Sequence, residues 1–242
     1  MERGYLIAIE GIDGCGKSTL AKNLYKNLQY RSKKPFRLRQ GFGGHSRQPL
    51  EMNRENILLT QEPGDTTLGK KLRAILHEEK ETTCDLAEYL LFAADRAQHF
   101  EEKIIPALKE KKLIISDRMS DSSLAYQGYG RELNTENIKL VNIWAMQNIK
   151  PNLTIYVKID TETAFQRIGT RGETLTSFEK EKKEFWQRVI NGFEKIYENR
   201  NDVITLDGTL SEEKLCAQAL ESIESFIKNE NCASPDSTDC RK

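Results

Sequence analysis

A glycine-rich stretch near the N-terminus has the residue types and spacing of a polyphosphate-binding loop. It reads GIDGCGKST from Gly11 to Thr19, with Lys17 and Ser18 directly after its last glycine. Glycines let backbone N–H groups turn inward around phosphate oxygens, lysine reaches the terminal phosphates, and the serine hydroxyl is a ligand for Mg²⁺. The stretch follows the strand-like run YLIAIE and opens the helical run KSTLAKNLYKNL, so it has the context that this chemistry requires.

Two charged neighbours, Asp117 and Arg118, follow the strand-like run KLIISD. An aspartate at this place in a protein with such a loop commonly directs Mg²⁺, and an adjacent arginine suggests a second charge for phosphate. The alternative is an aspartate that only caps the next element.

Phe92 and Arg96 are four residues apart in the helical stretch LLFAADRAQHF, hence on one face of a helix. A ring there can stack on a flat base while the guanidinium bonds the edge of that base. The alternative is a core phenylalanine beside a surface arginine.

Strand-like and helix-like runs alternate along the chain. The strand-like runs are 5–10, 56–61, 112–117, 153–159 and 203–207; the helical patterns are 17–29, 67–79, 84–110, 134–148, 161–170, 178–199 and 211–229. This alternation predicts an α/β fold with a five-stranded parallel sheet and helices on both faces. Such a sheet places its ligands beyond the carboxyl ends of its strands, so the informative loops are expected after Glu10, Gln61, Asp117, Ile159 and Asp207.

The length allows one large domain or two small ones, and the alternation of strands and helices favours one. The chain has 242 residues, and 37 Lys and Arg balance 37 Asp and Glu, so no overall positive field attracts nucleic acid or a membrane surface. With neither a membrane-length apolar run nor a signal peptide, we expect a cytoplasmic protein.

Five scattered cysteines without a C-x-x-C pair argue against a zinc site or a disulfide framework. Cys15 is singled out, because a thiol in an anion-binding loop at a helix N-terminus is expected to have a lowered pKa.

Two segments do not fit a compact α/β chain. Residues 31–55 hold seven Lys or Arg against two Glu and show no clear period; we interpret them as a flexible basic surface insert, with a contact site for a partner or phosphate as the alternative. Residues 230–242 are polar and are predicted to be a disordered tail, which leaves 1–229 as the principal domain.

Five sequence blocks together closely resemble bacterial thymidylate kinase, in the P-loop nucleoside monophosphate kinase family. They are EGIDGCGKST, TQEPGDTTLGKKLRAIL, LLFAADRAQHF, SDRMSDSSLAYQG and AFQRIGTRG. The resemblance covers residues 5–229 apart from the insert. It implies a P-loop NTPase fold with a lid at about 167–180, transfer of the γ-phosphoryl group of ATP to dTMP in dTTP synthesis, Mg²⁺ as cofactor, and a homodimer.

The resemblance also assigns residues to the two nucleotides. Those implied for ATP are Gly11, Ile12, Asp13, Gly14, Cys15, Gly16, Lys17, Ser18, Thr19 and Arg167, with Ser18 and Asp117 for Mg²⁺. Those implied for dTMP are Asp13 at the 3′-hydroxyl, Arg73 and Arg118 at the 5′-phosphate, Glu62 shaping that pocket, Phe92 on the base, Arg96 and Gln127 at the base edge, and Ser123. Lys17, Arg118, Asp13 and the lid residue Arg171 are the implied catalytic set.

The chain departs from the family pattern at Gln61, Met119, Thr176 and Ser177. Two alternatives stay open. A different nucleotide kinase or a deoxynucleoside kinase is one, with Glu62 recast as the base that such a kinase needs for a neutral hydroxyl. A nucleotide-dependent switch protein is the other, suggested only by NRND at 199–202.

Overall fold

Five short apolar runs pair side by side as one parallel sheet in the computed structural model, which describes residues 4–31, 56–78, 83–172, 175–176 and 178–232. The strand order is β2-β3-β1-β4-β5. The strands are β1 (Tyr5–Glu10), β2 (Ile57–Gln61), β3 (Leu113–Asp117), β4 (Leu153–Lys158) and β5 (Val203–Asp207). The α/β fold class with five parallel strands, expected from the sequence, is therefore confirmed.

Strand β1 lies at the centre of the sheet and contributes side chains to the apolar core on both faces. Its side chains alternate between the two faces of the sheet. Ile7 and Ile9 join the larger apolar cluster, whereas Leu6 and Ala8 join a second one on the opposite face. Because both faces are covered, the strand is almost continuously apolar, as central parallel strands are.

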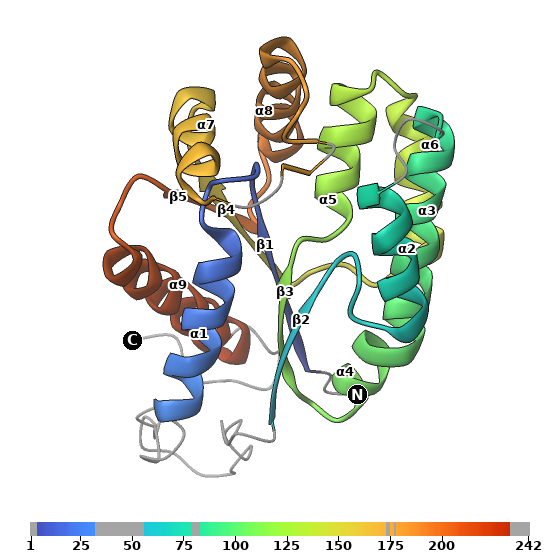
Figure 1. Ribbon diagram of the computed structural model, residues 1–242. Helices are drawn as coiled ribbons and strands as arrows, with labels where there is room; N and C mark the ends of the chain where they lie inside the picture. The colour runs from blue at the N-terminus through green and yellow to red at the C-terminus, as the bar shows by residue number, and fades with distance from the viewer. Residues whose placement is uncertain (1–3, 32–55, 79–82, 173–174, 177, 233–242) are drawn as a thin grey trace, which may run out of the picture.

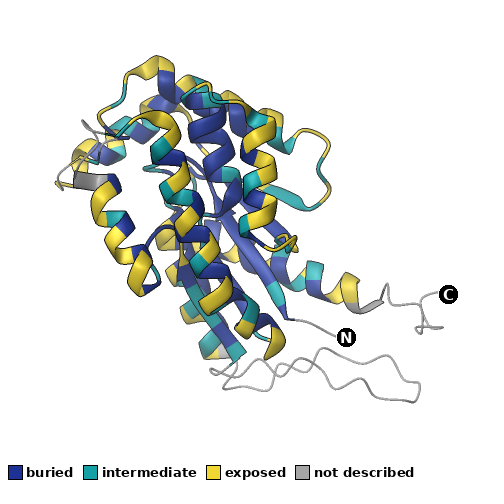
Figure 2. Ribbon diagram, turned by 90° about the vertical axis from the view of Figure 1, so that its right-hand side faces the viewer, coloured by how far each residue is buried: buried dark blue, intermediate teal, exposed yellow. Residues whose placement is uncertain are grey.

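Helices cover the sheet on both sides (Figure 1). On one side lie α1 (Lys17–Arg31) and α9 (Glu212–Cys232). On the other side lie α2 (Thr67–Glu78), α3 (Asp85–His99), the π-helical segment η3 (Phe100–Ile104), α4 (Ile105–Lys109) and α6 (Thr135–Ala145). Figure 2 shows the strands and inward helix faces buried and the outer helix faces exposed.

Four further helical segments are α5 (Ser120–Ser123), the π-helical segment η4 (Leu124–Gly130), α7 (Thr161–Thr170) and α8 (Lys183–Tyr197). Of these, α5, α7 and α8 stand towards the end of the molecule where the strands finish (Figure 1). The chain therefore surrounds the carboxyl edge of the sheet with helices.

The helix expected over 84–110 is confirmed, because α3, η3 and α4 follow one another without a break from Asp85 to Lys109. Two other expectations about helices were wrong: residues 120–130 form α5 and η4 where no helix was predicted, and the helix expected from 178 begins only at Lys183. The run SDSSLAYQGYG is rich in serine and glycine, which are poor helix formers, so its local signal is weak. Tertiary packing stabilises it: a Cβ on Gly192 of α8 would lie 2.7 Å from the Cβ of Tyr129, so glycine permits the close approach of α8 to η4.

The two segments set apart in the sequence lie mostly outside the described residues, 32–55 and 233–242. Helix α9 continues through Cys232, so residues 230–232, expected in the tail, are helical. Among the described helices, none combines the length and apolarity needed to cross a membrane.

Candidate active site

The carboxyl ends of β1, β2 and β3 open into one cavity of about 490 Å³. Predicted phosphate and metal residues on its wall are Asp13, Lys17, Ser18, Arg73, Asp117 and Arg118. Predicted residues for the acceptor base and the lid on the same wall are Glu62, Phe92, Arg96, Ser123, Gln127 and Arg171. The fold thus gathers twelve residues, from five separate sequence blocks, around one space.

The glycine-rich loop joins β1 to the N-terminus of α1. Gly14 and Gly16 have φ angles of 79° and 93°, a left-handed conformation that glycine adopts without steric cost. Lys17 is buried, and its Nζ donates to the carbonyl of Ile12 at 3.2 Å and to Oδ1 of Asp13 at 3.3 Å. The ammonium group is therefore held at the mouth of the loop, at the positive end of the helix dipole.

Arg118 meets the same carboxylate from the other side. Its Nη2 pairs with Oδ1 of Asp13, and its Nη1 donates to the carbonyl of Gly11 at 3.1 Å and to Oγ of Ser122 at 2.9 Å. Burial alone would raise the pKa of Asp13, but the charges of Arg118 and Lys17 hold that pKa well below its usual value. Asp13 is therefore ionised and connects the glycine-rich loop to Arg118 at the end of β3.

Tyr126 is a residue of this site that sequence reasoning missed. Its hydroxyl donates to Oδ2 of Asp13 at 3.1 Å and accepts from the backbone N–H of Asp13 at 3.1 Å. It comes from η4, inside the block SDRMSDSSLAYQG. Tyr126 thus lines the cavity and contacts the same carboxylate as Lys17 and Arg118.

Glu10 holds the segment that carries Arg118. Fully buried at the end of β1, its carboxyl group accepts the backbone N–H of Met119 at 2.8 Å and lies 2.5 Å from the hydroxyl of Ser122. Arg118 itself has a φ of 72°, a conformation that costs free energy for a residue with a Cβ. Burial, with the nearby charge of Asp121, raises the pKa of Glu10 to about 8.

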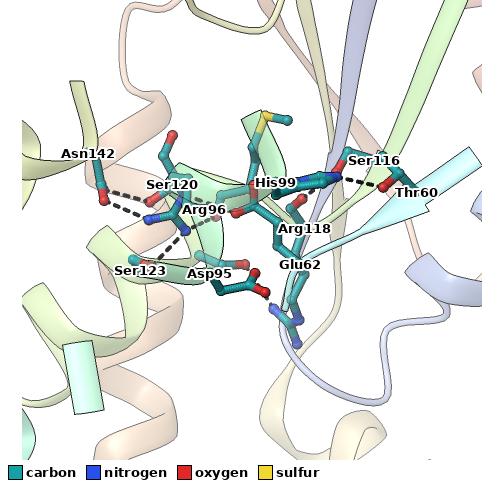
Figure 3. A network of polar contacts seen from close by, with 12 residues as sticks. Thr60, Glu62, Asp95, Arg96, His99, Ser116, Arg118, Ser120, Ser123 and Asn142 are labelled. Carbon is teal, nitrogen blue, oxygen red and sulfur yellow. Dashed lines mark hydrogen bonds and ion pairs between the residues drawn. The ribbon is translucent and has the colours of Figure 1, made fainter. Parts of the chain in front are cut away.

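Glu62, at the turn after β2, is the centre of a buried polar network (Figure 3). Its Oε2 lies 2.9 Å from Nε of Arg96, and its Oε1 lies 2.9 Å from Nδ1 of His99. The other ring nitrogen of His99 is 2.6 Å from Oγ1 of Thr60. Burial alone would raise the pKa of Glu62, but the charge of Arg96 and the contacts with His99 lower it. Glu62 is thus an ionised anchor and a poor proton acceptor.

Arg96 spans the gap between this network and α6. It is buried, its Nη1 donates to Oδ1 of Asn142 at 2.7 Å, and its Nη2 donates to Oγ of Ser123 at 3.0 Å and to the carbonyl of Met119 at 3.3 Å (Figure 3). The alternative of a surface arginine beside a core phenylalanine is therefore wrong. Its planar fork is fixed on several sides, which pre-organises it for a planar ligand.

The wall near Arg73 contains a second residue that sequence reasoning missed, Asp95. Nη1 of Arg73 donates to the carbonyl of Pro63 at 2.8 Å. Oδ1 of Asp95 accepts the backbone N–H of Gly64 at 3.1 Å, and burial with the charge of Glu62 raises the pKa of Asp95 to about 6. Asp95 could have been found from the sequence, because it lies between Phe92 and Arg96 in the stretch LLFAADRAQHF on α3.

Aromatic rings close the cavity around Phe92. Phe178 is buried, with its ring centroid 6.0 Å from that of Phe92 and 5.6 Å from that of Tyr126. Phe178 belongs to the segment predicted as the start of a helix, where the structure has a turn. The residues around the expected lid therefore pack directly on the ring predicted to stack on a base.

The two predicted lid arginines differ in their surroundings. Arg171 lines the cavity and pairs with the buried carboxylate of Glu179 at 2.9 Å. Arg167 lies one helical turn earlier and donates to the carbonyl of Gly14 at 3.4 Å, behind the glycine-rich loop. Glu179 also accepts the backbone N–H of Thr176 at 2.8 Å; Ser177 is outside the described residues.

Asp117 and Ser18 lie at the edge of the cavity where a metal was expected. Oδ1 of Asp117 is buried and has no hydrogen-bond partner among the described residues. The described part of the chain contains no group of three or more residues suited to hold a metal ion by themselves. One carboxylate and one hydroxyl suit Mg²⁺, which keeps most of its waters and binds largely through substrate phosphates.

The remaining members of the predicted loop set lie behind the cavity. Cys15 was expected to have a lowered pKa, and this was wrong: its side chain is fully buried, and burial raises the pKa of the thiol. Its backbone N–H donates to the carbonyl of Ile12 at 3.3 Å. Ile12 is also buried, and Thr19 is exposed outside the cavity.

The chain is similar to known proteins in both sequence and structure. The family model described as thymidylate kinase matches residues 47–219. A thymidylate kinase of Halothermothrix orenii is 37% identical over 230 residues, covering 93% of this chain and 99% of that protein. One of Thermoanaerobacter sp. is 36% identical over 226 residues, covering 93% and 100%. A crystal structure of thymidylate kinase from Ehrlichia chaffeensis aligns with a TM-score of 0.68 and 26% identity over 91% of this chain and 98% of that one.

Proposed function

Because the chain belongs to the thymidylate kinase family, and so is a nucleoside monophosphate kinase that phosphorylates dTMP with ATP to give dTDP and ADP, we propose roles in that reaction for the residues around its cavity. The observation that supports them best is the convergence of Lys17 and Arg118 on Asp13. A cation from the glycine-rich loop and one from the residue after β3 lie on the same carboxylate, which supports our proposal that the donor and acceptor phosphates meet there.

The reaction needs positioning and charge neutralisation more than it needs a base. The phosphate of dTMP is already an anionic nucleophile, so the protein must bring two mutually repelling phosphates into line. In our proposal the backbone of Gly11 to Thr19 and the Lys17 ammonium hold the phosphates of ATP. Arg73 and Arg118 hold the acceptor phosphate, and the ionised Asp13 accepts a hydrogen bond from the 3′-hydroxyl.

The base of dTMP is assigned to the wall of α3 and η4. Phe92 stacks on thymine, Arg96 and Gln127 bond its edge, and Ser123 lines the same pocket. Glu62 supports this arrangement by fixing Nε of Arg96. Phe178, packed against Phe92, limits access of water to the base.

Mg²⁺ is assigned to Ser18 and Asp117. The buried and unpartnered Oδ1 of Asp117 supports this assignment, because a carboxylate oxygen without a donor is costly unless a cation or water satisfies it. When bound with ATP, Mg²⁺ supplies positive charge to the phosphate oxygens.

Arg171 is assigned to the charge that develops between donor and acceptor, and Arg167 to support of the loop. Both belong to the lid that we propose at residues 167–180 of a kinase domain spanning 1–229. Such a lid excludes water, which would otherwise take the phosphoryl group.

A homodimer is proposed through α3 and α6. These helices expose apolar side chains beside one another: Leu140 and Trp144 of α6 are 65% and 82% exposed, and Leu86, Leu90 and Ile143 are also exposed. Exposed apolar groups gathered on adjacent helices are typical of an interaction surface. The cytoplasmic location expected from the sequence stays a prediction.

Neither alternative activity gains support. A deoxynucleoside kinase would need Glu62 as a base, yet Arg96 and His99 occupy both of its oxygens. In the NRND stretch, Arg200 is tied to Asp121 at 2.9 Å and to Asp202 at 2.6 Å, a structural role.

The experiment that tests the proposal is an acceptor panel read by ADP formation. Purified protein with ATP and Mg²⁺ is offered dTMP, dUMP, dCMP and thymidine. We expect dTMP to be the best acceptor, with thymidine near background. Faster turnover of thymidine than of dTMP would contradict the assignment of Arg73 and Arg118 to an acceptor phosphate.

A further inference from the structure

Glu88 is a buried carboxylate on the same face of α3 as the two residues assigned to the base. It precedes Phe92 by four residues and Arg96 by eight, so the three lie one above another along the helix. Its Oε1 accepts Nε2 of Gln127 at 2.9 Å, and its Oε2 lies 3.4 Å from Nη2 of Arg131. Neither the sequence motifs nor the roles proposed above include it.

The contact with Glu88 decides which way the amide of Gln127 faces. A primary amide has a donor side and an acceptor side of nearly equal shape, so its partners determine its orientation. A carboxylate in an ion pair only accepts hydrogen bonds, so the amide nitrogen must face Glu88. The oxygen of Gln127 is thereby turned away from Glu88.

The position of Gln127 makes this orientation relevant to a ligand. Gln127 lies in the π-helical segment η4, and its backbone carbonyl accepts the N–H of Leu133 at 3.1 Å. Its side chain lines the cavity. One of the two N–H groups of the amide is committed to Glu88, and the oxygen on the side away from Glu88 is available to the edge of a base as a hydrogen-bond acceptor.

We propose that Glu88 is a positioning residue that makes the site select pyrimidines with a donor at N3. Thymine and uracil carry an N–H at N3, whereas N3 of cytosine is an acceptor and would face the amide oxygen without a proton between them. The inference rests on the proposed contact of Gln127 with the base edge. A site that presents a fixed buried hydrogen-bonding group discriminates strongly against an analogue that leaves it unpaired.

Arg131 supports this arrangement from the other side of Glu88. Its Nη2 pairs with Glu88, its Nη1 pairs with Glu181 at 2.7 Å, and its guanidinium carbon lies 4.6 Å from the ring centroid of Phe185. A buried carboxylate is tolerated only when a cation and hydrogen bonds satisfy it. Arg131 thus balances the charge that orients Gln127.

The test is the substitution Glu88→Gln with three acceptors, dTMP, dUMP and dCMP. A glutamine at this position can donate or accept, so the amide of Gln127 is free to present either side. We expect the ratio of kcat/KM for dTMP to that for dCMP to fall by about tenfold or more, a change on the scale of one hydrogen bond to a charged group. The ratio for dTMP to dUMP should not change, because both bases carry the same N3–H.

Asp85→Asn is the matched control. Asp85 is on the same helix and its Oδ1 lies 3.4 Å from Nε of Arg131, whereas the amide of Gln127 donates to Glu88. We expect this variant to keep the wild-type ratio of dTMP to dCMP. Because each ratio is measured on one preparation, partial loss of folded protein changes all acceptors alike and cannot produce the expected shift.

A third variant, Gln127→Leu, separates the inference from the roles on which it depends. If it leaves the dTMP to dCMP ratio unchanged, Gln127 does not read the base, and both the proposed contact and the inference are overturned. If Gln127→Leu lowers the ratio but Glu88→Gln keeps it within twofold of wild type, the inference alone is overturned. An equal fall for all three acceptors in Glu88→Gln would also overturn it, since that is the effect of a general loosening.

Discussion

Arg171 is held by Glu179: Nη2 of the arginine lies 2.9 Å and 3.1 Å from the two carboxylate oxygens. Glu179 is buried, whereas the side chain of Arg171 keeps 36% of its surface exposed. The acid thus anchors a partly exposed cation at the wall of the cavity, in a segment that the sequence pattern assigned to the lid. This geometry gives the role of Arg171 a direct test.

Arg171→Ala is expected to lower kcat by roughly 10²- to 10⁴-fold, comparable to or less than removal of an arginine finger. Dissociation constants for ATP and dTMP should change little, because the proposed contact forms in the transition state. Pre-steady-state transfer and equilibrium binding measure the two effects separately. Arg167→Ala serves as the comparison and should lower kcat less. Unchanged chemistry in Arg171→Ala would assign the lid charge to another residue.

Lys17→Ala should abolish transfer while the fold persists. The ammonium is a point charge at the terminal phosphates, and loss of such a group typically lowers the rate by about 10²-fold or more. Lys22→Ala is the matched control, since Lys22 lines the same cavity from the next turn of α1 but is exposed. Steady-state ADP formation measures the transfer rate, and a circular dichroism spectrum shows whether the fold persists. Near-normal turnover of Lys17→Ala would contradict the phosphate assignment.

Arg118→Ala and Arg96→Ala should impair different properties of the enzyme. Arg118→Ala is expected to weaken dTMP binding and turnover together, because its phosphate contact exists in both ground and transition states. Arg96→Ala removes the cation beside the buried Glu62 and should damage base recognition and also destabilise the fold by about 3–5 kcal/mol. Thermal unfolding combined with acceptor preference distinguishes them. Identical preference profiles with identical melting temperatures would contradict the separation of phosphate and base contacts.

The proposed dimer is tested at its most exposed residue. Trp144→Glu places a charge in the apolar face of α6 and should shift the protein to a monomer, with the fold intact because the side chain is 82% exposed. Sedimentation velocity at several concentrations measures the change. Lys139→Glu, on the same helix and outside the apolar set, is the control. A wild-type protein that sediments as a monomer throughout would refute the proposal.

Strands and the phosphate loop were predictable from the sequence because local pattern determines them. β1 reads as a buried strand since both faces of it are covered, and Gly14 and Gly16 supply the positive φ that the loop requires. Arg96 was placed on the correct helix face by its spacing from Phe92. Those features depend on neighbours within a few residues.

Contacts across long stretches of chain could not be predicted in this way. Glu10 was interpreted only as the end of a strand, although it fixes Met119, which is 109 residues away. Tyr126 sits in η4, a helix without local signal that forms by packing on α8. A thiol at a helix N-terminus was expected to have a lowered pKa. The pKa of Cys15 is raised instead, because the effect of burial is larger than that of the nearby positive charges.

The buried carboxyl group of Glu10 should make stability depend on pH. Its pKa is raised from 4.5 to about 8 by burial first and by the charge of Asp121 second. Between these two values the folded protein retains a proton that the unfolded chain has released. The stabilisation from this group is therefore fully present below the unfolded pKa and is lost as pH rises through about 8.

Glu10→Gln keeps the shape and hydrogen-bonding capacity of the side chain but cannot ionise. We expect the free energy of unfolding of the wild type to fall more steeply between about pH 5 and about pH 8.5 than that of the variant, because only the wild type must lose the buried proton. Urea unfolding followed by tryptophan fluorescence measures both curves. Glu221→Gln, an exposed carboxylate on α9, should keep the wild-type slope. If Glu10→Gln also keeps that slope, the buried group that titrates in this range is not Glu10, and its hold on Met119 and Ser122 is that of an ionised carboxylate.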